Sequence, residues 1–286
     1  MNSDQLMELL ETSDRLPKLP PALNEIFEML KKPLDIKLEE FVRIINQNEH
    51  LSTLLLKTIN SGSFQLERKI QSVKEAVLYL GMNTVQTLLI AFVTKSFFPD
   101  CLGRAKIFSR EKYWKHCVGT CAASNQLSIK TGLGDRYKLF AYGLIHDIGI
   151  AVLDICLPNI IDDVFTIQQR GVHQIIAERE VMDGLSHADI GAWLCKKLNL
   201  PEDFTSVTEY HHKPFLAKNF TEEVKLIHFG DMISTEYYER LLGLHLNHSM
   251  NRILMESIKV TQEDVLEISE TLPEEVDKLG ILVSLI

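Results

Sequence analysis

The chain has 286 residues and a formal charge of −9 at pH 7, so it is long enough to bury a hydrophobic core without disulfide bonds. The negative charge argues against a nucleic acid partner, because binding to a phosphate backbone requires a basic surface. The five cysteines include no Cys-x-x-Cys pair, which indicates reduced thiols rather than a secreted disulfide framework or a zinc knuckle.

The N-terminal segment and the apolar stretches predict a soluble, cytoplasmic protein. Residues 1–10 mix Asp4 and Glu8 with leucines and lack the basic start of a signal peptide. The longest uninterrupted apolar stretches, such as 88–93 and 148–153, are much shorter than the roughly 20 residues that span a bilayer. We therefore expect no membrane contact.

The spacing of apolar residues predicts an all-α protein, because they recur every three or four positions and no stretch alternates as a strand does. Residues 1–12 form a helix or an interaction arm. Ser72 with Glu75 matches a capping box, and Gly81 closes the helix that follows Ser72. The helices predicted for an N-terminal lobe are 22–31, 38–47, 51–59, 73–80 and 83–98.

A stretch without periodicity at 99–109 predicts a boundary between an N-terminal lobe, 13–105, and a second helical lobe, 106–242. The helices predicted for the second lobe are 111–130, 136–154, 159–169, 173–182, 186–198, 202–211 and 222–242. Residues 243–286 form a C-terminal extension. Its last helix begins near Thr261, which is capped with Asp264, and we expect Pro273 to interrupt it.

Five of the ten histidines and two aspartates form an ordered series in the second lobe. Imidazole nitrogen and carboxylate oxygen together suit divalent iron, manganese, zinc or nickel, and the helices of a bundle can aim them inward from several sides. The series therefore predicts a pocket for one or two divalent metal ions. Its members are His116, His146, Asp147, His187, His211, His212 and Asp231.

Two members of the series lie on helix faces that are otherwise apolar. Asp231 shares a stripe with Val224 and Ile227, and a buried carboxylate is costly unless it is paired or coordinates a metal. Ile190 follows His187 by three residues, so the ring of His187 should also face inward.

His146 and Asp147 are adjacent on the predicted helix 136–154, where they would point about 100° apart. Asp147 is therefore the natural bridge between two halves of one cluster. His228, one turn before Asp231, is a candidate for supporting the ligands from outside. The other histidines predict only ordinary structural roles; these are His50, His173, His245 and His248.

Several further motifs stand out along the chain: LPKLP at 16–20, NS at 60–61, KIQSV at 69–73, Ala76, LG at 80–81 and GLIHDIG at 143–149. Together they resemble the HDOD domain, a bacterial signalling module related to the HD phosphohydrolases. The resemblance covers about residues 13–215. It implies an HD-like helical bundle and a regulatory or scaffolding protein that acts on protein partners.

The resemblance also assigns the series to two metal positions that share Asp147, which would be the catalytic residue of an active site. The first position would use His116, His146, Asp147 and Asp231. The second would use His187, His211 and His212, with Asp147 bridging.

Two differences separate the chain from cyclic-di-GMP phosphodiesterases of the same broad family. Ile150 stands where those enzymes have a lysine that helps neutralise a phosphate, and 211–215 reads HHKPF without a Gly-Tyr-Pro motif. Lys213 could replace that lysine only in part. Hydrolysis of cyclic-di-GMP is therefore not expected.

Three hypotheses follow from these observations. The first is a signalling module without catalysis, whose pocket holds a metal or a small phosphorylated ligand. The second is a metal-dependent phosphohydrolase acting on a nucleotide or phosphoester. In the third, the histidines only cross-link the core of a helical interaction protein.

Overall fold

The computed structural model describes residues 2–16, 28, 37–60, 66–96, 105–106, 108–241 and 251–283. Every regular element in these ranges is helical, which confirms the fold class predicted from the spacing of apolar residues. Most of the predicted helix 22–31, of the LPKLP motif and of the boundary stretch 99–109 lies outside the described residues.

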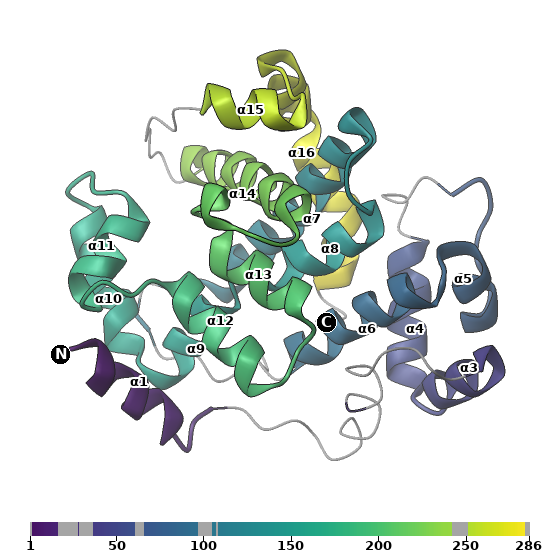
Figure 1. Cartoon of the computed structure of the whole chain (residues 1–286), viewed down its shortest axis with the longest axis horizontal. Coiled ribbons are helices and arrows are strands. Elements are labelled where there is room, and N and C mark those ends of the chain that lie inside the picture. Colours follow the sequence, from purple (N-terminus) through teal and green to yellow (C-terminus); the bar gives the residue numbers. More distant parts are fainter. Residues whose placement is uncertain are drawn as a thin grey trace.

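The N-terminal helices separate into two places (Figure 1). The first helix lies beside α9 and α10 and buries Leu6 and Leu10 completely, while the others gather on the opposite side of the molecule. Ser72 accepts a hydrogen bond from the Glu75 amide at the start of α5, as predicted. The helices are α1 (Ser3–Glu11), α3 (Leu38–Asn46), α4 (Glu49–Ile59), α5 (Val73–Leu80) and α6 (Met82–Ser96).

The rest of the described chain is a bundle built around its longest buried helix, α7, which packs against α8, α14 and α16. Helix α12 packs between α9 and α13, and α6 joins the N-terminal helices to α8. The elements are α7 (Arg110–Thr131), α8 (Arg136–Ile145), α9 (Ile148–Cys156), α10 (Pro158–Gln168), α11 (Gln174–Val181), α12 (His187–Lys197), α13 (Glu202–Tyr210), the 3₁₀ turn η1 (Pro214–Leu216), α14 (Thr221–Leu241), α15 (Arg252–Ile258) and α16 (Gln262–Val283).

Two helix predictions are wrong. The predicted continuous helix 136–154 is divided by a turn at His146 and Asp147, where Asp147 leaves helical geometry with φ −97° and ψ 16°. Apolar residues are buried on both sides of that turn, so periodicity cannot reveal it. Helix α16 continues through Pro273, because buried residues on both sides of the proline anchor the helix against α7. Helix α15 was not predicted.

One described helical stretch, Arg136–Cys156, is long and apolar enough to cross a membrane. The bent pair Val73–Leu80 and Met82–Val93 passes the same test if it is taken as one broken span. In the first stretch 94% of the apolar window is buried inside the protein, so packing against neighbouring helices explains its composition.

The helices that carry the histidine and aspartate series cross closely at glycines. A Cβ atom on Gly149 of α9 would lie 1.9 Å from the carbonyl oxygen of His187 in α12. On Gly143 of α8 it would lie 2.8 Å from the amide nitrogen of Cys121 in α7, and on Gly230 of α14 it would lie 2.9 Å from a main-chain oxygen of α7. Only glycine permits these approaches, which bring the ligand-bearing segments together.

Candidate metal centre

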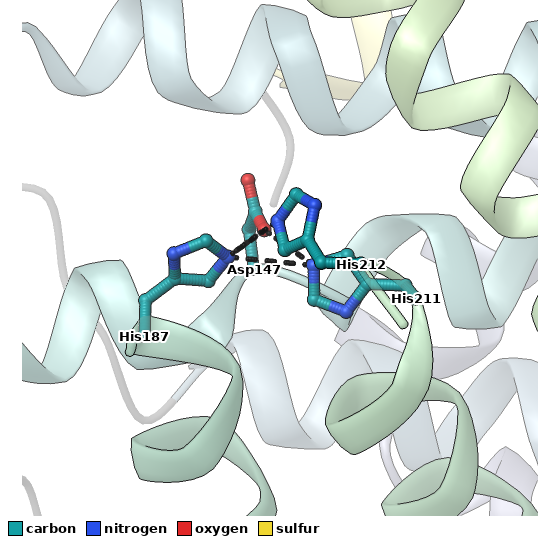
Figure 2. Close-up of side chains that lie close together, drawn as sticks. All are labelled: Asp147, His187, His211 and His212. Atoms are coloured by element: carbon teal, nitrogen blue, oxygen red, sulfur yellow. Dashed lines mark hydrogen bonds and ion pairs between the residues drawn. The ribbon is translucent and has the colours of Figure 1, made fainter. Parts of the chain in front are cut away.

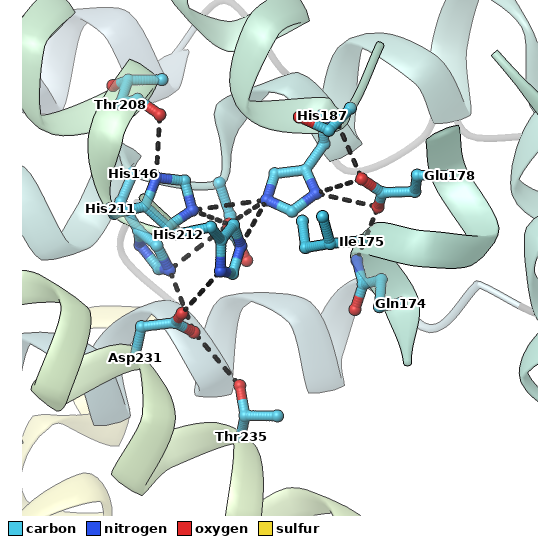
Figure 3. A network of polar contacts seen from close by, with 12 residues as sticks. His146, Gln174, Ile175, Glu178, His187, Thr208, His211, His212, Asp231 and Thr235 are labelled. Atoms are coloured by element: carbon cyan, nitrogen blue, oxygen red, sulfur yellow. Dashed lines mark hydrogen bonds and ion pairs between the residues drawn. The ribbon is translucent and has the colours of Figure 1, made fainter. Parts of the chain in front are cut away.

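The seven predicted side chains converge at the centre of the bundle. Figures 2 and 3 label all of them except His116. They form two groups that share Asp147, and in each group the candidate ligand atoms lie within 4.8 Å of one another. One group is His116, His146, Asp147 and Asp231; the other is Asp147, His187, His211 and His212. This division matches the two metal positions expected from the resemblance.

The first group brings α7 and α14 to the turn between α8 and α9. The Nε2 atom of His116 lies 3.3 Å from Asp147 Oδ2 and 3.3 Å from Asp231 Oδ1. His146 Nε2 lies 3.4 Å from Asp147 Oδ1 and 3.7 Å from Asp231 Oδ1. Two imidazoles and two carboxylates therefore face one another.

In the second group, three imidazoles gather beside Asp147 (Figure 2). Asp147 Oδ1 lies 3.0 Å from His187 Nε2 and 3.3 Å from His211 Nε2. The Nε2 atom of His187 also lies 3.4 Å from that of His211 and 3.1 Å from that of His212. His212 approaches the first group through Nδ1, which is 3.6 Å from Asp231 Oδ2.

The polar atoms of this cluster fit a metal ion better than they fit one another. Within the described part of the chain, His146 Nε2 and Asp147 Oδ1 are buried without a hydrogen-bond partner, although charged groups lie nearby. The Nδ1 atoms of His146 and His211 lie 2.8 Å from the carbonyl oxygens of Gly143 and Thr208, to which they can donate, leaving each Nε2 as a ligand atom. The cluster could therefore hold a metal.

Burial and neighbouring charges oppose each other at the titratable groups. Burial disfavours the protonated form of His116, but hydrogen bonds to Asp147 and Asp231 outweigh it and raise its pKa to about 9. Burial also acts against the ionised form of Asp147, yet the nearby imidazoles hold its pKa well below the usual value. For His211 and His212, burial is the largest cause of a lowered pKa, and a neutral imidazole is the form that binds metal.

A buried carboxylate that the sequence analysis missed, Glu178 of α11, lies behind His187 (Figure 3). Both of its carboxylate oxygens are 2.8 Å from His187 Nδ1, and one accepts the His187 main-chain N–H at 2.9 Å. The available signal was a carboxylate with Ile175 and Val181 three residues to either side, the same kind of pattern that identified Asp231.

Of the remaining histidines, His228 and His173 make hydrogen bonds in the described structure. His228 places Nδ1 2.6 Å from the carbonyl oxygen of His211, so it supports the main chain of a candidate ligand. His173 accepts a hydrogen bond from the Ile175 amide at the start of α11. His50 is exposed, whereas His245 and His248 lie outside the described residues.

The structure also shows the surroundings of Ile150 and Lys213, the two residues considered above in place of the phosphodiesterase lysine. Ile150 is half-buried and packs against the hydrophobic core. Lys213 donates to Asp189 at 3.2 Å and lies over the ring of Tyr210, 5.5 Å from its centroid. Its charge is therefore already engaged by a carboxylate.

Comparison with known proteins identifies the family. The model of the HDOD domain matches residues 16–214. An uncharacterized protein of Treponema pallidum (strain Nichols) is 27% identical over 230 residues. That alignment covers 77% of this chain but 42% of the relative, so the chain spans less than half of the relative's length.

Solved structures share the fold at low sequence identity. An HDOD domain protein with unknown function from Geobacter sulfurreducens has a TM-score of 0.72 at 21% identity, covering 98% of this chain and 96% of that one. A protein of Marinobacter aquaeolei VT8, provisionally named a signal transduction protein, has a TM-score of 0.72 at 17% identity. The match covers 99% of this chain and 65% of that one. A protein of Shewanella amazonensis SB2B, provisionally named a metal-dependent phosphohydrolase, has a TM-score of 0.59 at 17% identity, and the match covers 96% of each chain. Because the family model matches residues 16–214, which is more than half of the chain, the chain belongs to the HDOD domain family.

Proposed function

We propose that this protein is a bacterial signal-transduction module whose central pocket binds one or two divalent metal ions and which acts through signalling protein partners. The observation that carries the proposal is the convergence of five imidazoles and two carboxylates in two groups that share Asp147. Iron, manganese, zinc and nickel are the ions that suit this mixture of nitrogen and oxygen ligands.

In this proposal each group of four would hold one ion, with Asp147 shared between them. Divalent ions bound there would supply Lewis acidity and lower the pKa of a coordinated water. The ligands come from α7, α12, α14 and the segments that end α8 and α13. Occupancy would therefore fix how these helices lie relative to one another, which is a property that a partner protein can recognise.

The regulatory role is favoured by the groups beside the pocket. Ile150 provides no charge for a phosphate, and Lys213 is engaged by Asp189. The seven side chains are also shielded, since the most exposed are His212 at 23% and His116 at 14%. A substrate would have to approach along the edge formed by these two residues.

A metal-dependent phosphohydrolase acting on a nucleotide or phosphoester is the second candidate, with Asp147 as its catalytic residue. The complete ligand set favours it, and so does the name of the Shewanella neighbour. A small phosphorylated ligand is a candidate occupant under either function. We propose a cytoplasmic location and no nucleic acid or membrane partner, from the charge and the burial of the apolar helices.

Elemental analysis of protein purified without a histidine tag tests the metal. We expect at least one equivalent of a transition metal in the wild type and a loss of bound metal when His146→Ala is combined with Asp147→Ala. Protein that takes up no divalent ion, even after incubation with iron, manganese or zinc, would leave only the helical interaction protein with a cross-linked core.

A release assay on nucleotides and phosphodiesters then separates the two candidate functions. The signalling module should show no turnover above that of Asp147→Ala. Turnover in the wild type that disappears in Asp147→Ala would reject the regulatory role in favour of the phosphohydrolase.

A further inference from the structure

We infer that Glu178, which lies outside the histidine and aspartate series, is a positioning residue of the second metal group, Asp147, His187, His211 and His212. It orients His187 and provides the buried negative charge on which the ion held by that group depends. The inference rests on the proposed metal binding, but it concerns a residue that the motif does not contain.

The contacts of Glu178 determine the direction of the His187 ring. The carboxylate accepts from His187 at both Nδ1 and the main-chain N–H, while Gln174 Nε2 donates to it at 2.8 Å. With Nδ1 protonated toward Glu178, the lone pair of Nε2 points to Asp147, 3.0 Å away. The side chain of Glu178 is 4% exposed, so bulk water offers it no alternative partner.

The contacts that orient His146 and His211 are of a different kind. His146 and His211 are held by main-chain carbonyl oxygens, which are neutral. Of these three histidines, His146, His187 and His211, only His187 is backed by a carboxylate. A carboxylate partner increases the basicity of the imidazole, so His187 should be the strongest nitrogen donor of its group.

Charge balance gives a second reason. Two divalent ions would bring four positive charges, whereas Asp147 and Asp231 bring two negative charges. Both aspartates belong to the first group, and the second group has only its share of Asp147. Glu178 adds a negative charge on the side of the second group, where burial makes an uncompensated charge costly.

Capping of α12 does not explain Glu178. The start of that helix already has a capping box, in which Asp189 accepts hydrogen bonds from the main chain and hydroxyl of Ser186. A purely structural carboxylate would also have no need to lie within hydrogen-bonding distance of the ring nitrogen opposite the candidate ligand atom.

The test is titration of metal-free protein with Zn²⁺ and with Mn²⁺ against a chromophoric chelator, with stoichiometry from elemental analysis. Glu178→Gln keeps a hydrogen-bond acceptor but removes the charge, and Glu178→Ala removes both. We expect the second ion to bind about 10-fold more weakly in the first variant and about 100-fold more weakly in the second. The first ion should bind as in the wild type.

Glu180→Gln is the matched control, because Glu180 is an exposed residue on the same helix, and it should leave both affinities unchanged. Asp231→Asn should have the opposite effect: it should weaken the binding of the first ion more than that of the second. If Glu178→Ala does not fold, the nearly isosteric Glu178→Gln decides. Wild-type affinities for every bound ion in a folded Glu178 variant would overturn the inference, whereas a wild type that binds no metal would overturn it together with the proposed function.

Discussion

At the scale of single residues, the cluster holds polar atoms that are costly in a protein interior. An unsatisfied buried donor or acceptor costs about 1–3 kcal/mol, and His146 Nε2 and Asp147 Oδ1 are both of this kind. They lie 3.4 Å apart without forming a hydrogen bond. The turn between α8 and α9 and the contact of His146 with Gly143 set the directions of these two atoms. Both atoms are therefore held where a bound ion could satisfy them.

The protonation of His116 predicts opposite pH dependences for stability and metal binding. Its pKa is about 9 in the folded metal-free protein against 6.5 for a free histidine side chain, because Asp147 and Asp231 outweigh the effect of burial. The His116 ion pairs therefore stabilise the metal-free protein fully below about pH 6.5 and progressively less as the pH rises through about 9. Metal binding requires the neutral ring and should strengthen over the same interval.

The measurement is the melting temperature of metal-free protein and its affinity for Mn²⁺ between pH 6.5 and 9.5. We expect the melting temperature to fall and the affinity to rise with pH. His116→Ala should flatten the trend in stability. An affinity that stays constant between pH 7 and 9 would contradict the assignment of His116 as a ligand.

The candidate ligands were predictable because each belongs to an ordered series and several are polar residues on an otherwise apolar helix face. Asp231 is an example, since burial of a lone carboxylate between apolar neighbours has few explanations. Glu178 was not predicted because it lies in the short helix α11, where two turns of periodicity give a weak signal. Its pairing with His187 is a tertiary contact that no spacing in the sequence encodes.

At the scale of helices, the site depends on close crossings rather than on helix length. Most predicted helices are confirmed with ends shifted by a residue or two, because caps such as Ser72 and Thr261 are local signals. The turn at Asp147 and the approach of Gly149 to His187 are set by packing between helices, so the sequence predicted neither. The continuation of α16 through Pro273 has the same origin.

Gly149→Ala should therefore disrupt the second metal group. The new Cβ would lie 1.9 Å from the carbonyl oxygen of His187 and 2.8 Å from the amide nitrogen of Gly191, so α9 and α12 must separate. We expect a loss of about 1–3 kcal/mol in the free energy of unfolding, and weaker binding of one ion as His187 moves away from Asp147.

Chemical denaturation and metal titration of the same samples measure both effects. Gly171→Ala is the control, since among the described residues nothing beyond its chain neighbours lies within 4 Å of its Cβ position. Only its left-handed backbone, with φ +81°, opposes the substitution. It should cost about 1–2 kcal/mol and leave metal binding unchanged. Unaltered binding in Gly149→Ala would show that the crossing does not position the site.

At the scale of the whole molecule, the cluster joins segments that are distant in the sequence. Its ligands run from His116 to Asp231, and the helices that carry them contact the remainder of the described chain through α6 on α8 and through α16 on both α7 and α4. Helix α1 adds a further connection, because its Ser3 amide donates to Asp183, near the start of α12. Stabilising the cluster should thus stabilise the described fold as a unit.

Metal binding is therefore expected to raise the stability of the protein in one cooperative transition. An ion that binds only the folded state adds about 2.7 kcal/mol at a free concentration 100 times its Kd. For a chain of this size that corresponds to a rise of roughly 5–10 °C in melting temperature, at about 2–4 °C per kcal/mol. Calorimetry of metal-loaded and chelator-treated protein measures it, with His146→Ala plus Asp147→Ala as the variant that should show no difference. If chelation removes the metal and the melting temperature does not change, the metal does not couple the helices, and a regulatory role based on their arrangement fails.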